Sequence, residues 1–110
     1  MDITTIGIDL AKNSFSLVGM NRQGKVVFRK TLARKKLLAF IAQCPSSLIG
    51  MEACSGAHYW GREFSKLGHR IGIIAAKFVE PYRKGAKNDN NDAEAICEAV
   101  SRPTIWFVPI

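Results

Sequence analysis

The stretch ITTIGID, residues 3–9, decides how this chain folds. It is a short apolar run that ends in a carboxylate, Asp9. Two further segments of strand-like composition follow, residues 13–19 and 25–29, joined by the polar residues 21–24, NRQG. Because a turn containing Asn and Gly is typical of a β-hairpin, the chain is predicted to begin with three antiparallel strands.

Helices and strands alternate after this start. Helices are predicted where apolar residues recur at helical spacing, and strands where a short run is almost entirely apolar. In chain order these segments are a helix over residues 34–43, a strand over 47–52, a helix over 57–67, a strand over 70–75, one helical turn or an irregular stretch over 77–82, a helix over 90–102, and a strand-like run over 105–110. This order predicts an α/β fold with a mixed sheet and helices packed on its faces.

Length and composition predict one soluble domain over residues 1–110. A chain of 110 residues with 47% hydrophobic and 23% charged residues suits a single compact core. No apolar run approaches the roughly 20 residues of a membrane span, and Asp2 makes the amino terminus acidic, so we expect a cytoplasmic protein. Cys44, Cys54 and Cys97 are odd in number and form no C-x-x-C pair, which predicts reduced residues in or near the core.

The charge balance favours a polyanionic partner. The net charge is +7, from 16 Lys and Arg against 9 Asp and Glu, and nucleic acid is the leading candidate for such a surface. The basic residues between 25 and 36 suit solvated charge on a hairpin and a helix start. Arg83, Lys84 and Lys87 are candidates for contacts with a nucleic-acid backbone, and Lys12 is either a further contact or an exposed turn lysine.

Two predicted strands end in acids. Asp9 closes the first strand and Glu52 closes the strand over residues 47–52. Ligands of mixed α/β sheets gather at the carboxyl ends of the strands, so the two acids are predicted to face each other if their strands are neighbours.

Two more acids begin the last helix. Asp89 and Asp92 are three residues apart and therefore neighbours on the first turn. An N-cap role for Asp89 and a favourable helix-dipole position for Asp92 are the alternative explanation. Asp92 is in helical register with Ile96 and Val100, which predicts that it points toward the sheet.

Four carboxylates in one place would need cations. Two unit charges about 4 Å apart repel by roughly 4 kcal/mol at an effective dielectric constant near 20. Hard divalent ions accept carboxylate oxygens and leave positions for water and phosphate. We therefore expect a pair of magnesium ions and a nucleic-acid phosphodiester as the substrate.

Three motifs together resemble a known family. They are GIDLAK at residues 7–12, MEACSGAHYW at 51–60 and KNDNNDA at 87–93. In this order they resemble the amino-terminal domain of the DEDD-type insertion-sequence transposases, which are related to the Piv invertases. That domain is similar to the Holliday-junction resolvase RuvC, so the resemblance implies a ribonuclease-H-like fold. It also implies Mg²⁺ or Mn²⁺ held by Asp9, Glu52, Asp89 and Asp92.

The resemblance carries further expectations. Members act in DNA transposition and site-specific recombination on the DNA ends of a mobile element, and some choose donor and target DNA with a guide RNA. They carry a second, carboxy-terminal domain with a nucleophilic serine, which does not follow Ile110, so we expect an excised or truncated domain. A homo-oligomer in full-length form, bound to DNA at the nucleoid, is also expected.

Two other classes of protein stay open. One is a non-catalytic nucleic-acid-binding or assembly module that has kept the fold. The other is a fragment of an actin-like sugar kinase, whose first strand also ends in an Asp. Residues 10–12, LAK, lack the glycine that such a phosphate loop needs, and the kinase leaves Asp89 and Asp92 without a role.

Overall fold

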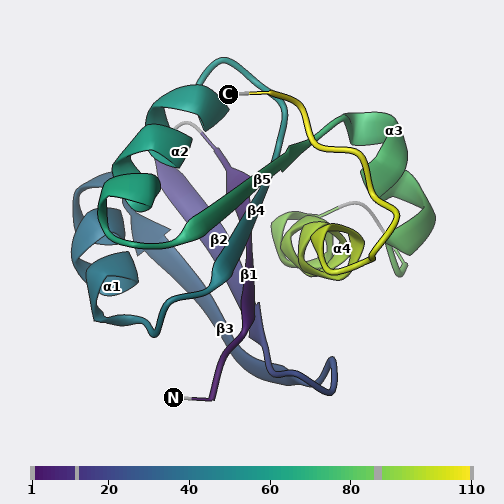
Figure 1. Cartoon of the computed structure of the whole chain (residues 1–110), viewed down its shortest axis with the longest axis horizontal. Helices are drawn as coiled ribbons and strands as arrows, with labels where there is room; N and C mark the ends of the chain where they lie inside the picture. Colours follow the sequence, from purple (N-terminus) through teal and green to yellow (C-terminus); the bar gives the residue numbers. More distant parts are fainter. Residues whose placement is uncertain (1, 12, 86–87, 110) are drawn as a thin grey trace.

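One mixed sheet carries the architecture. The computed structural model describes residues 2–11, 13–85 and 88–109, and within these residues five strands form a sheet of order β3-β2-β1-β4-β5 (Figure 1). The strands are β1 (Thr5–Leu10), β2 (Ser14–Met20), β3 (Val26–Ala33), β4 (Leu48–Glu52) and β5 (Arg70–Ile74). The first three are antiparallel neighbours, whereas β4 is parallel to β1 and β5 is parallel to β4. The predicted antiparallel start and α/β class are confirmed, and the sheet is consistent with a ribonuclease-H-like fold.

Helices cover both faces of the sheet. They are η1 (Arg34–Lys36), α1 (Leu37–Gln43), α2 (Ala57–Lys66), α3 (Ala76–Val79), η2 (Glu80–Tyr82) and α4 (Asp89–Val100). Figure 1 shows α1 and α2 on one side of the sheet and α4, with α3 beside it, on the other. Within the described residues, none of these helices is both long enough and apolar enough to cross a membrane.

The third strand is longer than predicted. The sequence placed its end at Arg29, but β3 runs on to Ala33, which pairs with Ser14 at the start of β2. Most of its side chains are exposed, so its composition lacks the apolar run that marks a buried strand. Backbone pairing with β2 therefore sets its length.

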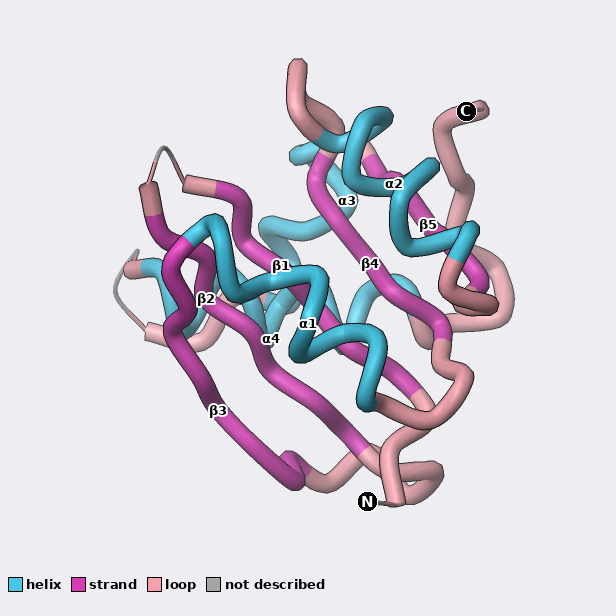
Figure 2. The backbone as a smooth tube through the Cα atoms, turned by 90° about the vertical axis from the view of Figure 1, so that its left-hand side faces the viewer, coloured by secondary structure: helices cyan, strands magenta, loops and turns pink. Residues whose placement is uncertain are grey.

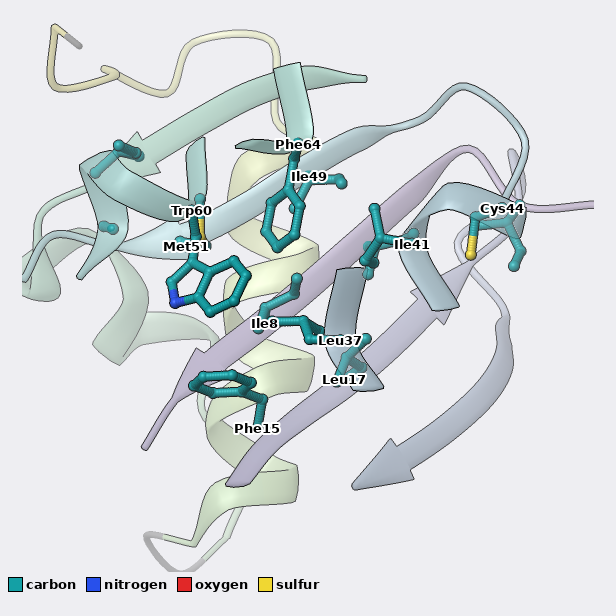
Figure 3. Close-up of a cluster of buried hydrophobic side chains, with 14 residues drawn as sticks. Ile8, Phe15, Leu17, Leu37, Ile41, Cys44, Ile49, Met51, Trp60 and Phe64 are labelled. Atoms are coloured by element: carbon teal, nitrogen blue, oxygen red, sulfur yellow. The ribbon is translucent and has the colours of Figure 1, made fainter. Parts of the chain in front are cut away.

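The larger core fills the space between the sheet and helices α1 and α2. Figure 3 shows its side chains, which come from all three of these layers. Trp60 of α2 meets Phe15 of β2 edge to face at 5.5 Å and stacks on Phe64 at 5.6 Å between ring centroids. These contacts hold α2, and with it the connection after Glu52, against the sheet.

The opposite face brings α4 unusually close to the sheet. Gly7 of β1 and Gly50 of β4 are register partners on this face. A Cβ atom built on Gly7 would lie 2.5 Å from the backbone nitrogen of Cys97, and one built on Gly50 would collide with the side chain of Val100. Glycine inside a strand commonly marks such a close approach, and here it lets α4 rest on the strands that carry Asp9 and Glu52.

Residues 105–110 were predicted to form a strand-like run, but the structure shows no strand in their described part, 105–109. The Val108 N–H nevertheless donates to the Ile73 carbonyl of β5 at 2.6 Å. A single backbone hydrogen bond at the sheet edge does not make a ladder.

The cysteines differ in exposure. Cys44 and Cys97 are buried and free, as predicted, but Cys54 is exposed, so the prediction was wrong for this residue because the connection 53–56 runs over the surface. Burial raises the pKa of the Cys97 thiol to about 12.

We expect a thiol reagent at about pH 8 to label Cys54 rapidly in the native protein and to leave Cys97 unreacted. With a pKa about three units above that of an ordinary thiol, the Cys97 thiolate is roughly a thousandfold scarcer. Mass spectrometry of labelled peptides before and after denaturation measures this. Equal labelling rates for the two residues in the native protein would contradict the buried position of Cys97.

Candidate metal and nucleic-acid site

Asp9 and Glu52 lie at the carboxyl ends of adjacent parallel strands. The last register pair of β1 and β4 is Ile8 with Met51, and the next residue on each strand is an acid. Both acids are half-buried. Side chains alternate along a strand, so each acid shares the face of the glycine two residues before it, which is the face that α4 covers.

Helix α4 presents Asp92 to the same face. The helix begins after its N-cap Asn88, whose side-chain oxygen accepts a hydrogen bond from the Asn91 N–H at 2.9 Å. The N-cap is therefore Asn88, and not Asp89 as the alternative explanation of the acids required. Asp92 is 9% exposed, and the residue after it, Ala93, packs over Gly7. The predicted inward orientation of Asp92 agrees with this burial.

Arg83 is the cation that meets Asp92. The Arg83 Nε donates to the Asp92 Oδ1 at 2.6 Å, and the two side chains are 20% and 12% exposed. The hydrogen bond that Arg83 donates to Asp92 raises the pKa of Arg83, and the charges of Asp92, Glu80 and Glu52 raise it further against an opposing effect of burial. One guanidinium thus lies within the field of acids from η2, β4 and α4, and it stays charged throughout the accessible pH range.

Lys84 and Arg29 tie the outer side of α4 to the rest of the fold. The Lys84 ammonium lies 2.7 Å from a Glu98 carboxylate oxygen and 3.5 Å from one of Glu94, and Arg29 of β3 lies 2.7 Å from Glu94. The hydrogen bond with Glu98 raises the pKa of Lys84. Burial pushes the pKa of Glu94 upward, but Arg29 and Lys84 together hold it below its ordinary value. These partly exposed pairs connect α4 to β3 and to the residue that follows η2 by two positions, and none of them involves Asp92.

Several predicted site residues fall outside the description. Lys12 and Lys87 are not among the described residues, and the side chain of Asp89 is not described either. Within the described part of the chain, no three His, Cys, Asp or Glu side chains lie close enough together to hold a metal ion.

The available donors nevertheless suit a hard divalent cation. Asp9, Glu52 and Asp92 are carboxylates. Asp9 and Glu52 lie near the ends of the neighbouring strands β1 and β4, and Asp92 lies on the first turn of α4, so all three are on the same face of the sheet. The guanidinium of Arg83 already lies next to Asp92, which shows that this face accommodates positive charge. Sequence reasoning identified the acids and Arg83 separately but missed their pairing, because residues nine apart across a loop follow no helical or strand period.

Comparison with known proteins places this chain in a family. The family model for DEDD transposases of the IS110 type, described as "Transposase", matches residues 6–109. A Pseudomonas aeruginosa protein named "Probable family 20 transposase" is 50% identical over 110 residues, which cover 100% of this chain and 32% of that protein.

Two further relatives agree. The transposase for insertion sequence element IS1328 of Yersinia enterocolitica is 48% identical over 107 residues, covering 97% of this chain and 32% of its own length. The transposase for insertion sequence element IS1111A of Coxiella burnetii is 40% identical over 107 residues, covering 97% of this chain and 29% of its own. This chain spans about a third of the length of these relatives, and by the family match over nearly all of its residues it belongs to the IS110-type DEDD transposases.

Proposed function

We propose that this domain supplies the divalent-metal site with which a transposase cleaves and exchanges DNA strands. The observation that carries the proposal is the common face of three acids from separate elements. Asp9 and Glu52 end adjacent parallel strands on the face where α4 holds Asp92 beside the guanidinium of Arg83. Asp89, on the same first turn as Asp92, completes the ligand set that the family resemblance implies.

Each group has a defined task in this proposal. Asp9, Glu52, Asp89 and Asp92 hold Mg²⁺ or Mn²⁺, and such ions activate the attacking oxygen and stabilise the leaving oxygen of a phosphodiester. Arg83, Lys84, Lys87 and Lys12 orient the DNA backbone by charge-assisted hydrogen bonds. Arg83 neutralises Asp92 in their ion pair, and its guanidinium would suit a phosphate oxygen if a metal ion took up the Asp92 carboxylate.

The remaining parts of the proposal concern the longer protein. Its partners are the DNA ends of a mobile element and a guide RNA, and it works as a homo-oligomer in the bacterial cytoplasm. A serine on a carboxy-terminal domain takes part in strand exchange. The family match favours a role in transposition over the actin-like kinase alternative.

Iron-directed cleavage of the polypeptide tests the metal site. Fe²⁺ replaces Mg²⁺ at carboxylate sites, and with ascorbate and peroxide it releases radicals that cut the nearby backbone. We expect cuts near residues 9, 52 and 92 that excess Mg²⁺ suppresses. Cuts scattered over the surface acids, or cuts that Mg²⁺ leaves unchanged, would overturn the proposal.

The second candidate function is a nucleic-acid-binding module that lacks catalysis. It is favoured by the Arg83–Asp92 ion pair, which already neutralises one of the acids, and by the lack of a three-residue metal cluster among the described side chains. If it holds, the chain binds DNA equally well with and without Mg²⁺, and the iron experiment gives no localised cuts.

Replacing Arg83 by glutamine is expected to tighten Mn²⁺ binding by about fivefold, because the guanidinium no longer competes for the Asp92 carboxylate. The same change should weaken DNA binding in the presence of Mn²⁺. Calorimetric titration measures the first effect and fluorescence anisotropy the second.

Lys84→Gln is the matched control for Arg83→Gln. It removes a cation from the adjacent position, but Lys84 pairs with Glu98 and Glu94 and not with Asp92. Equal Mn²⁺ affinities in the two variants would show that the Arg83–Asp92 pair has no bearing on metal uptake.

A further inference from the structure

A second basic surface lies at the end of the sheet where the parallel strands begin, opposite the end that carries Asp9 and Glu52. A hollow of about 510 Å³ opens where the parallel strands begin, and a neighbouring hollow of about 430 Å³ opens beside the end of α4. Both are bordered by Met20, Arg22, Gly24 and Ser101, so they form one continuous groove. We call it the Arg22 groove.

The Arg22 groove is distant from the carboxylates. Thr5 borders it at the start of β1, and Asp9 lies four residues further along the same strand, which corresponds to about 13 Å at roughly 3.3 Å per residue. In Figure 2 the β2–β3 turn and the N-terminal residues lie together at the lower end, whereas β1 and β4 end at the upper end. The groove is therefore separate from the proposed metal site.

Three arginines from distant parts of the chain meet in the groove. Arg22 lies on the β2–β3 turn, Arg70 begins β5, and Arg102 follows α4. All three side chains are exposed, and none forms an ion pair with any acidic side chain that the structure describes. Three positive charges gathered without counter-charges attract a polyanion.

The surroundings of Arg22 and Arg102 are ordered. The side-chain oxygen of Asn21 accepts the N–H groups of Gln23 and Lys25, both at 3.0 Å, and so holds the turn that presents Arg22. Arg102 lies over the ring of Tyr82, at 5.2 Å from the guanidinium carbon to the ring centroid. A fixed guanidinium loses less freedom when it meets a phosphate.

Negative charge in the groove is small by comparison. Glu98 borders it, but the Lys84 ammonium neutralises this carboxylate at 2.7 Å. The carboxyl end of α4 adds only about half a negative charge. Three guanidinium groups without an ion-pair partner among the described acids outweigh it.

We propose that the Arg22 groove binds the phosphodiester backbone of a nucleic acid at a second place, without metal and independently of the carboxylates. With the groove at one end of the sheet and the proposed metal site at the other, the domain has two places for a nucleic-acid backbone. These two places can hold one nucleic acid or two. The proposal shares the class of ligand with the proposed function and does not require the metal site to exist.

Binding in EDTA tests this proposal apart from the metal site. Fluorescence anisotropy would be measured over a range of salt concentrations, with a labelled duplex DNA and with a hairpin RNA that has the same number of phosphates. The variant combines Arg22→Gln, Arg70→Gln and Arg102→Gln. The matched control combines Lys36→Gln, Arg62→Gln and Lys77→Gln, which removes the same charge from exposed residues elsewhere.

We expect the arginine variant to bind at least about tenfold more weakly near physiological salt, and its salt slope to fall by up to about 2.7, since each phosphate contact contributes about 0.9. The control should keep most of both. Whichever nucleic acid shows the larger loss is the natural ligand of the groove.

Three outcomes would overturn the proposal. They are no binding by the unmodified chain in EDTA, no change in the arginine variant, and equal losses in the variant and the control, which would indicate net charge alone. Arg22→Gln by itself, with an expected slope change of about 0.9, gives a second measure if the triple variant proves unstable. Failure here leaves the iron-cleavage experiment unaffected, and the reverse also holds.

Discussion

Replacing Asp9 by asparagine is expected to abolish the uptake of Mn²⁺ by this domain. The amide has nearly the same shape but carries no charge, and a hard divalent ion needs the carboxylate to offset the loss of its water shell. Residues that merely support a metal ligand change affinity by about 10- to 100-fold, so the loss of a ligand should exceed about 100-fold. Calorimetric titration of Mn²⁺ into both proteins measures the difference.

Asp2→Asn is the control for Asp9→Asn, because it makes the same chemical change at an exposed acid that precedes β1, at the opposite end of this strand from Asp9. It should bind Mn²⁺ as the unmodified chain does. Thermal unfolding of both variants shows whether the fold is kept. Equal uptake by Asp9→Asn and the unmodified chain, or negligible uptake by both, would remove the basis for the metal site.

Replacing Gly7 by alanine should lower the free energy of unfolding by about 3 kcal/mol, at the upper end of the usual cost of overpacking. The new methyl group would overlap the Ala93 carbonyl oxygen and lie 2.5 Å from the Cys97 nitrogen, and neither backbone atom can rotate away. Helix α4 must then shift, taking Asp92 away from the strand that carries Asp9. Urea unfolding measures the stability, and Mn²⁺ affinity should fall with it.

Gly56→Ala is the matched substitution. Gly56 has a helical conformation, φ −88° and ψ −15°, and a Cβ there would meet its nearest neighbours, Leu10 and Trp60, at 3.9 Å. We expect a change of less than about 1 kcal/mol, as an exchange between Gly and Ala near a helix start allows. If Gly7→Ala is no more destabilising than Gly56→Ala, the close contact between α4 and β1 does not exist in solution.

The two predictions concern one feature, the contact between α4 and the strands that carry the acids. The sheet alone places Asp9 beside Glu52. The third acid, Asp92, reaches this face only because glycine at position 7 lets the helix backbone come close. The geometry of the proposed metal site and the stability of the fold should therefore change together when this contact is altered.

Local pattern was enough for most of the fold. Helical spacing predicted α2 over residues 57–67, and the structure ends it at Lys66. The Asn- and Gly-containing turn predicted the β2–β3 hairpin, and Gly24 adopts the positive φ, 81°, that such a turn needs. These elements were predictable because turn chemistry and the burial of one face act over a few neighbouring residues.

Other elements could not be predicted in this way. The full length of β3 depends on pairing with β2, since its own residues are largely exposed. The Arg83–Asp92 ion pair joins a loop to a helix, and the Arg22 groove joins a turn, a strand start and a helix end. No sequence period relates these positions, so composition showed the excess of basic residues but not where they gather.

The sequence by itself determined the order of the five sheet strands and of the helices between them, the family, and the positions of the acids at strand ends and on a helix start. These follow from local periodicity, from turn residues and from three short motifs, each contained in a few consecutive residues. Only the tertiary structure decided that Arg83 neutralises Asp92, that Gly7 sets the depth of α4, and that three arginines share one groove. The physical reason is that these contacts arise when separate elements pack together, and packing distance is not encoded in the spacing of residues along the chain.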